Sequence, residues 1–226
     1  FIEGREDLAW ENDKVAFRMY GPALAVEVNN GIDVWSKCVD YLIVEKWYKL
    51  EEDSIASYHE DHGEGADFYS VGKSLGCGGS ALLSDGRLYQ SGVFSTYKIL
   101  ENGPLRAQFE LKYVDFDANG KSFSETKIIT LDAGSQLNKI ESKYDQSLEP
   151  FSFATGLVVR ENQTANLDSV NSIISLWGNN SENPNDGQTG IGVVYPSKVE
   201  IVKTQDETPH LLVIDSAQKE AYTYYA

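Results

Sequence analysis

The fold is decided by an alternation of apolar and polar side chains in Leu105-Arg106-Ala107-Gln108-Phe109-Glu110-Leu111-Lys112-Tyr113. Successive side chains of a β-strand point to opposite faces of the sheet, so a period of two predicts a half-buried strand. Ala107, Phe109, Leu111 and Tyr113 would then face the core, with charged side chains on the other face. No other stretch of the chain predicts a strand as clearly.

Strand patterns and turns continue outward from this stretch. Asn119-Gly120 is a typical hairpin turn, so we expect residues 122–131 to form a returning strand, and residues 137–144 to continue the meander. Residues 35–50 are better explained by one or two strands than by a helix. Further strands are predicted at residues 15–20, 23–28, 93–100, 151–159, 190–195, 199–203 and 211–215. The sequence therefore predicts an all-β fold, a large antiparallel β-sandwich that forms one domain over residues 1–226.

The net charge of the chain restricts the classes of partner that it can bind. The 226 residues contain 19 Lys and Arg against 35 Asp and Glu, a net charge of −16, which repels phosphate backbones and anionic lipid surfaces. We therefore expect no nucleic-acid partner and no membrane partner, and no stretch approaches the roughly 18 apolar residues that span a bilayer. A small anionic substrate remains compatible with this charge, because a few cations can hold one carboxylate. Cys38 and Cys77 could pair or remain thiols, and the oligomeric state is left open.

The most distinctive chemistry lies in the histidine loop, which we define as residues 58–69, and in the glycine-rich run that follows it to residue 79. Two of the three histidines, His59 and His62, fall in this loop. Histidine titrates between pH 5 and 8, so these side chains suit proton transfer or metal binding. A long solvated connection is the alternative, but long loops in compact domains tend to be functional. We therefore predict a functional loop on a rigid scaffold.

A divalent metal is possible at this loop but is not required. His59 and His62 could bind zinc or manganese together with Asp61, Glu64 or Asp67. On a loop, however, a spacing of three residues does not fix the ligand geometry as it would on a helix. The metal ligands therefore remain unassigned.

The same segment can supply acid and base chemistry. Removing a proton beside a carboxylate needs a base, an acid for the leaving oxygen, and a cation that stabilises the enolate-like intermediate. The candidates are His59 and His62 as bases, Tyr58 and Tyr69 as acids, and Arg18 and Lys73 as cations. A surface salt bridge from Arg18 to Glu11 or Asp13, and core packing of the tyrosines, are the structural alternatives.

Aromatic side chains suggest a carbohydrate. The chain has 4 tryptophans and 13 tyrosines, and aromatic faces stack on the C–H faces of sugar rings. If Trp10, Trp35 or Trp47 lined a groove beside the histidine loop, a sugar would be its natural occupant. The predicted substrate-binding residues are Trp10, Tyr20, Trp35, Glu64 and Lys73. The run Gly76-Cys77-Gly78-Gly79 lacks the features of a phosphate loop, so a nucleotide cofactor is not expected.

Several motifs in order resemble one bacterial family. They are Trp10-Glu11-Asn12-Asp13, Ala16-Phe17-Arg18-Met19-Tyr20-Gly21-Pro22, Gly31-Ile32-Asp33-Val34-Trp35, Asp61-His62-Gly63-Glu64-Gly65, Gly76-Cys77-Gly78-Gly79, Leu100-Glu101-Asn102-Gly103-Pro104 and Leu131-Asp132-Ala133-Gly134. The family consists of domains of unknown function associated with polysaccharide utilisation, and it resembles galactose-mutarotase-like supersandwiches and an ulvan-oligosaccharide dehydratase. Its members are usually longer at both ends.

This resemblance implies a secreted or periplasmic enzyme that carries out β-elimination on uronic-acid oligosaccharides, as a dehydratase or a lyase without a required cofactor. A non-catalytic carbohydrate-binding module and a mutarotase-like or epimerase-like sugar enzyme are the alternatives. One departure from the family pattern is Asp40, which stands where an arginine is expected. The preferred substrate could differ accordingly.

Overall fold

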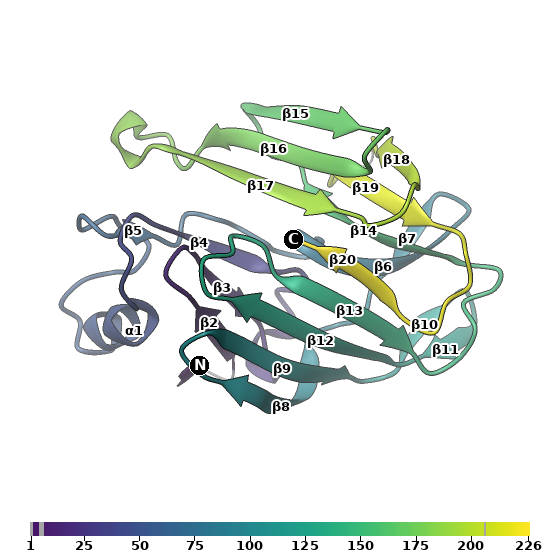
Figure 1. Ribbon diagram of the computed structural model, residues 1–226, viewed down its shortest axis with the longest axis horizontal. Helices are drawn as coiled ribbons and strands as arrows, with labels where there is room; N and C mark the ends of the chain where they lie inside the picture. Colours follow the sequence, from purple (N-terminus) through teal and green to yellow (C-terminus); the bar gives the residue numbers. More distant parts are fainter. Residues whose placement is uncertain (1, 5–6, 206) are drawn as a thin grey trace.

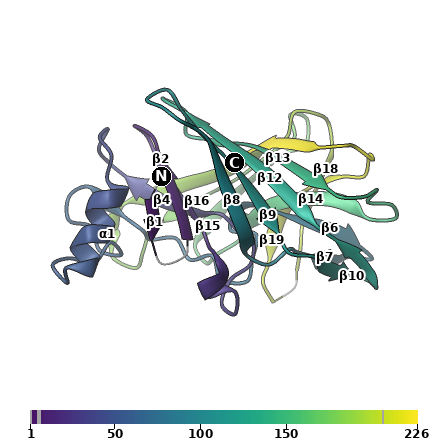
Figure 2. The same ribbon diagram turned by 90° about the horizontal axis from the view of Figure 1, so that it is seen from below.

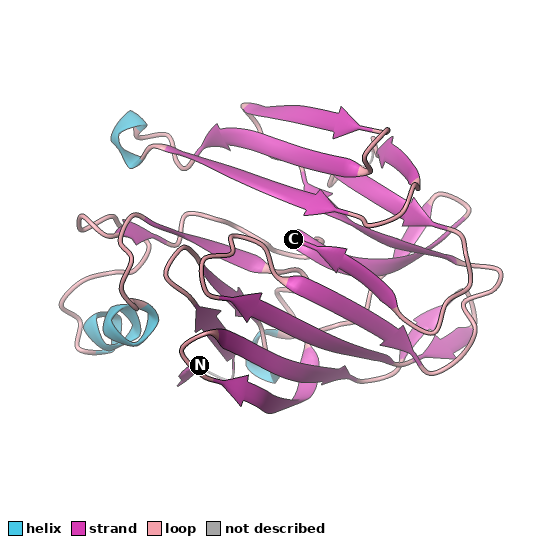
Figure 3. Ribbon diagram, viewed as in Figure 1, coloured by secondary structure: helices cyan, strands magenta, loops and turns pink. Residues whose placement is uncertain are grey.

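The computed structural model describes residues 2–4, 7–205 and 207–226, and antiparallel strands dominate it (Figures 1 and 3). The all-β prediction is confirmed. The largest sheet has eight strands in the order β15-β16-β17-β20-β13-β12-β9-β8. Their bounds are β8 Phe94–Asn102, β9 Arg106–Tyr113, β12 Glu125–Asp132, β13 Lys139–Tyr144, β15 Gln163–Asp168, β16 Ile173–Asn179, β17 Gln188–Val194 and β20 Tyr222–Tyr225.

Two five-stranded sheets lie behind the large sheet and complete the sandwich (Figures 1 and 2). One contains β6 Cys77–Ser84, β7 Arg87–Tyr89, β14 Ser152–Val158, β18 Glu200–Lys203 and β19 His210–Asp215. The other contains β1 Ile2–Gly4, β2 Asp7–Glu11, β3 Ala16–Met19, β4 Asp33–Lys37 and β5 Gly65–Ala66. A bridge between Ile32 and Gly76 connects the two sheets into one back layer. A small hairpin of β10 Phe116–Ala118 and β11 Lys121–Phe123 lies apart from them.

The core fills the space between the two layers. Phe109 and Leu111 are both 0% exposed, as the alternation in β9 predicts. The Phe109 ring lies 4.7 Å from Trp10 of β2, and Phe153 of β14 stacks on Tyr222 of β20 at 4.4 Å between ring centroids. These contacts from front to back bury the apolar faces of both layers, and this burial is the main source of stability.

Four local predictions are wrong. Residues 23–28 form the short helix η1 (Pro22–Leu24) and a turn, because Pro22 begins a tight turn in which the Ala25 N–H bonds to the Pro22 carbonyl at 3.2 Å. Residues 35–50 continue β4 and then form the helix α1 (Val44–Glu52). Residues 122–131 are split at Ser124 between β11 and β12. The glycine-rich run enters strand β6 at Cys77 instead of staying a loop.

The helix α1 lies at one end of the sandwich, beside the histidine loop (Figure 1). It buries Val44, Trp47 and Tyr48 on one face, which places these side chains at the i, i+3 and i+4 spacing of an amphipathic helix. The carboxylate of Glu11 accepts the N–H groups of Ile43 and Val44, each at 2.9 Å. A contact from β2 therefore satisfies the N-terminus of a helix whose own residues offer no side-chain cap.

Candidate functional site

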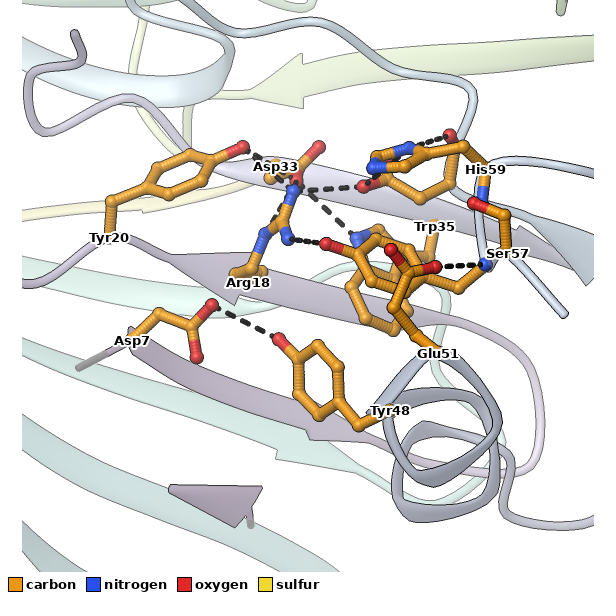
Figure 4. Close-up of polar contacts among 11 residues, drawn as sticks. Asp7, Arg18, Tyr20, Asp33, Trp35, Tyr48, Glu51, Ser57 and His59 are labelled. Carbon is orange, nitrogen blue, oxygen red and sulfur yellow. Dashed lines mark hydrogen bonds and ion pairs between the residues drawn. The ribbon is translucent and has the colours of Figure 1, made fainter. Parts of the chain in front are cut away.

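A buried arginine lies at the centre of the candidate site. Arg18 sits in β3, opposite Asp33 of β4, and its residue exposure is only 7%. The alternation of β3 sends Arg18 and Tyr20 to the same face, as the sequence predicts, and Arg18 Nη2 lies 3.0 Å from the Tyr20 hydroxyl. Both side chains converge on Asp33 Oδ2, which accepts bonds from Arg18 Nη2 at 2.6 Å and from the Tyr20 hydroxyl at 2.8 Å (Figure 4).

The histidine loop is attached to this centre through two of its side chains. Asp67 Oδ2 accepts a bond from Arg18 Nη2 at 2.8 Å. The Tyr58 hydroxyl accepts one from Arg18 Nη1 at 3.1 Å. Arg18 therefore pairs with two buried carboxylates and holds a tyrosine, and the alternative of a salt bridge to Glu11 or Asp13 is wrong.

The charges of this cluster favour a protonated carboxyl group. One guanidinium faces two carboxylates, Asp33 and Asp67, that are 0% and 3% exposed. Burial, and then the charge of Asp33, raises the pKa of Asp67 to about 8 despite the opposing effect of Arg18. Burial also raises the pKa of Asp33. Two carboxylates that share one cation in a dry site do not both ionise readily.

His59 lies at the edge of this buried cluster. Its Nδ1 is 3.1 Å from the Asp67 carbonyl oxygen and 3.6 Å from the Asp67 carboxylate, while its side chain is 54% exposed. Its ring packs against Tyr58 at 4.3 Å between centroids. A carbonyl at Nδ1 favours the tautomer with the proton on that nitrogen. Nε2 then carries the free lone pair of the ring.

The other predicted acid, base and cation residues lie elsewhere. His62 is exposed, with Nε2 at 3.1 Å from the Ser57 carbonyl oxygen. Tyr69 keeps a buried hydroxyl that makes no hydrogen bond within the described residues, and burial raises its pKa well above the ordinary value. Lys73 is exposed. Of the predicted catalytic residues, the structure brings together Arg18, Tyr58 and His59.

Most of the predicted sugar-binding residues are too deeply buried to contact a sugar. Trp10 and Trp35 are 1% and 0% exposed, so neither ring offers a face to a ligand. The Trp35 ring stacks between Trp47 at 5.8 Å and Tyr58 at 5.2 Å. Tyr20 is bonded within the Arg18 cluster. These side chains pack inside the protein, behind the site, and are not exposed at its surface.

Glu64 has a structural role in the loop. Its carboxylate accepts bonds from Lys46 at 2.7 Å and Trp47 at 3.1 Å, and also from the Tyr41 hydroxyl. The hydrogen bonds from Lys46 and Tyr41 lower its pKa to about 2. Glu64 therefore fastens the histidine loop to α1.

A cleft of about 650 Å³ opens beside the histidine loop, between β4 and strands β16 and β17. Asp61, Gly65 and Phe68 of the loop form part of one wall, and Trp177 forms part of another. Trp177 is 54% exposed, in contrast to the other three tryptophans.

Neither a metal centre nor a disulfide appears in the part of the chain that the structure describes. Among those residues, no group of three or more His, Cys, Asp or Glu side chains is placed to hold a metal ion. Cys38 is an exposed free thiol and Cys77 a buried one. Within the same residues, no helix is long and apolar enough to cross a bilayer.

Residues 3–226 match a family described as "Domain of unknown function (DUF4861)". The chain belongs to the DUF4861 family. It is also 39% identical over 209 residues to a protein of Formosa agariphila named "Uncharacterized protein P7". That match covers 87% of the chain and 51% of the relative, so this DUF4861 chain spans about half the length of the curated relative that it matches. No solved structure was found to match it.

Asp33 and Trp177 of this DUF4861 site were missed as site residues, and Asp67 was named only as a possible metal ligand. Asp33 begins β4 between the apolar residues Ile32 and Val34, where a buried carboxylate needs a cation. Asp67 follows buried Ala66 at the end of β5. Trp177 alternates with Ile174 and Leu176 in β16, which are 0% and 1% exposed, and this parity puts Trp177 on the outer face.

Proposed function

We propose that this DUF4861 chain belongs to a carbohydrate-active enzyme that carries out β-elimination on uronic-acid oligosaccharides outside the cytoplasm. The observation that carries the proposal is the placement of His59. Its ring is half in water, and its Nδ1 faces the carbonyl of Asp67, a residue whose side chain is salt-bridged to Arg18. A histidine held in this way suits a general base. The resemblance to a dehydratase acting on uronate oligosaccharides gives the substrate class.

The proposed reaction begins at Nε2 of His59. This nitrogen takes the proton from C5 of the uronate, and the electron pair of that C–H bond forms the C4–C5 double bond. The C4–O bond breaks, and its oxygen leaves with a proton from an acid. A dehydratase would release water, whereas a lyase would release the neighbouring sugar, on which the bridging oxygen becomes a hydroxyl group.

Tyr58 is the proposed acid. Its hydroxyl lies 3.1 Å from Arg18 Nη1, and its ring touches that of His59. A guanidinium beside the phenol oxygen stabilises the negative charge that develops as the proton is given away.

Arg18 takes a different role from the one that the sequence predicts. Salt bridges to Asp33 at 2.6 Å and Asp67 at 2.8 Å already compensate its charge, so it is poorly suited to grip the carboxylate of a substrate. We assign it the positioning of Tyr58 and of the loop that carries His59. Its effect on catalysis would act through those residues.

The test follows the product and uses the two histidines as a matched pair. Elimination conjugates a double bond with the carboxylate, so ultraviolet absorbance should rise when the protein is incubated with ulvan, pectic or glucuronan oligosaccharides. His59→Ala should lower kcat by about 100-fold or more. His62→Ala, on the exposed side of the same loop, should stay within about threefold of the parent.

Three outcomes would count against the proposal. No chromophore from the parent protein with any of these oligosaccharides would reject β-elimination. Optical rotation that changes without a chromophore would favour the mutarotase-like alternative. Equal losses in both histidine variants would remove His59 from the role of base.

A further inference from the structure

The cleft of about 650 Å³ beside the histidine loop has a shape and a lining that the proposed acid and base residues do not use. Its walls include Asp61 and Phe68 of the loop on one side, and Trp177 and Gln188 on the other. A cleft of this volume is within the range of small-ligand sites. The cleft adjoins the histidine loop, which contributes Asp61, Gly65 and Phe68 to its lining.

Trp177 is held as a fixed platform in this cleft. It pairs in register with Gly190 of β17, and its ring covers the place where a side chain at Gly190 would lie. A Cβ at Gly190 would stand 2.6 Å from Trp177 Cε3. The indole Nε1 donates to Gln188 Oε1 at 3.0 Å, and Gln188 in turn donates to Asn179 Oδ1 at 2.9 Å. The ring is therefore oriented before any ligand arrives, yet Trp177 remains 54% exposed.

The strand beneath the platform leaves room for a ring. In β17, the indole covers the position of a side chain at Gly190, and Gly192, which also lines the cleft, has no side chain to fill the space beside it. Polar groups surround this space. Gln188 and Asn180 supply amides, and Ser36 and Thr189, whose hydroxyls lie 2.6 Å apart, join the two walls. A flat aromatic face with amides and hydroxyls around it is the chemistry that recognises a pyranose ring.

The charges of the cleft select a neutral ring. Asp61 and Asp186 lie in the lining. The two lysines of the lining are already paired, because Lys14 Nζ lies 3.3 Å from Asp13 and the buried Lys37 Nζ lies 3.1 Å from Glu11. A carboxylate or sulfate on a ring at this place would meet like charges without a free cation. Sugar hydroxyls, in contrast, can donate to the two aspartates.

We propose that the Trp177 cleft binds an uncharged pyranose residue of an oligosaccharide, stacked on the indole. The location follows from the cleft alone, whereas the idea that this ring belongs to the same chain as a uronate rests on the proposed function. Under both proposals the substrate class is an oligosaccharide that contains uronic acid and neutral sugars.

Calorimetric titration of the His59→Ala protein tests binding without turnover. The probes are xylotetraose and cellotetraose as neutral chains and a glucuronan tetrasaccharide as the charged one. At least one neutral chain should bind with a Kd below about 1 mM and at least tenfold more tightly than the glucuronan chain. Trp177→Ala should weaken this binding by tenfold or more, while Trp177→Phe should retain most of it.

Two further variants separate a binding role from a structural one. Gly190→Ala keeps the indole but displaces it, so it should also weaken binding. Leu167→Ala removes an exposed apolar side chain from β15, outside the cleft lining, and should leave the Kd unchanged. Trp177→Ala and Leu167→Ala should share the same thermal unfolding midpoint, while only Trp177→Ala changes the affinity.

The inference is overturned if neither neutral chain binds below about 5 mM, or if Trp177→Ala binds within twofold of its parent. Tighter binding of the glucuronan chain would overturn the neutral selectivity. These failures are distinct from failure of the proposed function, which is judged by the chromophore. A protein that binds neutral chains at Trp177 and forms no chromophore would support the cleft and reject the elimination.

Discussion

At the scale of single residues, the surroundings of Asp67 favour the protonated form of its carboxyl group. Its pKa in the folded protein is about 8, against an ordinary value of 3.8, because burial and Asp33 oppose its ionisation. The folded state therefore binds more protons than the unfolded state between these two values. Stability from this group is fully present below about pH 4 and is lost as the pH rises toward 8.

Asp67→Asn tests this proton. The amide cannot ionise, and its oxygen can still accept the bond from Arg18. We expect the difference in urea midpoint between pH 5 and pH 8 to shrink in the variant, because the loss carried by Asp67 disappears. Asp168→Asn is the control, since hydrogen bonds from Asn171 lower the pKa of this partly exposed carboxyl below its ordinary value of 3.8. An unchanged slope in Asp67→Asn would show that this side chain ionises normally.

The residue types of the site could be predicted from the sequence. Which charged side chains pair with the same partner could not. The alternation of β3 places Arg18 with Tyr20, and the structure confirms that placement. What the sequence could not show is that Asp33 and Asp67, from separate segments, compete for the same guanidinium. Local patterns give the direction of a side chain along a strand, whereas charge pairing depends on contacts across the fold.

At the scale of elements, Glu11 supports the start of α1. Its carboxylate accepts the N–H groups of Ile43 and Val44 and pairs with Lys37, whose side chain is 0% exposed. Glu11→Ala leaves a buried ammonium with one charge partner fewer and a helix end without its acceptor. We expect a loss of about 3–5 kcal/mol in the free energy of unfolding.

Urea denaturation of a matched pair checks this value. Glu45 is the acidic residue of the first turn of α1 and is exposed. An exposed carboxylate in the first turn contributes little through the helix dipole, so Glu45→Ala should lower the free energy of unfolding by less than about 1 kcal/mol. Similar losses in both variants would mean that Glu11 acts only as a surface charge.

The same contact explains why α1 was not predicted. Trp47, Tyr48 and Val44 are aromatic or β-branched and favour strands locally. The acceptor for the first N–H groups comes from β2, far back in the sequence. Strands such as β9 were predictable because a period of two is a local property, but a helix stabilised by tertiary contacts is not.

At the scale of the whole molecule, β20 joins the two halves of the large sheet. It lies between β17 and β13, and its neighbouring tyrosines point to opposite faces. Tyr224 is 0% exposed and donates to the Gly78 carbonyl of the back layer at 2.8 Å, whereas Tyr225 is 37% exposed. Of these two tyrosines of β20, only Tyr224 contacts the back layer.

Alanine at each tyrosine measures this link. Tyr224→Ala opens a cavity between the layers and leaves the Gly78 carbonyl without this donor, so the free energy of unfolding should fall by about 3–5 kcal/mol. Tyr225→Ala should lower it by no more than about 1 kcal/mol. Chemical denaturation followed by tryptophan fluorescence gives both values. Equal losses would contradict a layer contact at Tyr224.

The central place of β20 also sets an order of assembly on the ribosome. The meander of β8, β9, β12 and β13 and the strands β15 to β17 are synthesised first, but the edges of β13 and β17 that β20 joins stay open until residue 226 has left the exit tunnel. Open edges invite pairing with the wrong strand. We expect nascent chains stalled before residue 222 to be cut readily by protease and held by chaperones, and chains that expose residue 226 to resist cleavage.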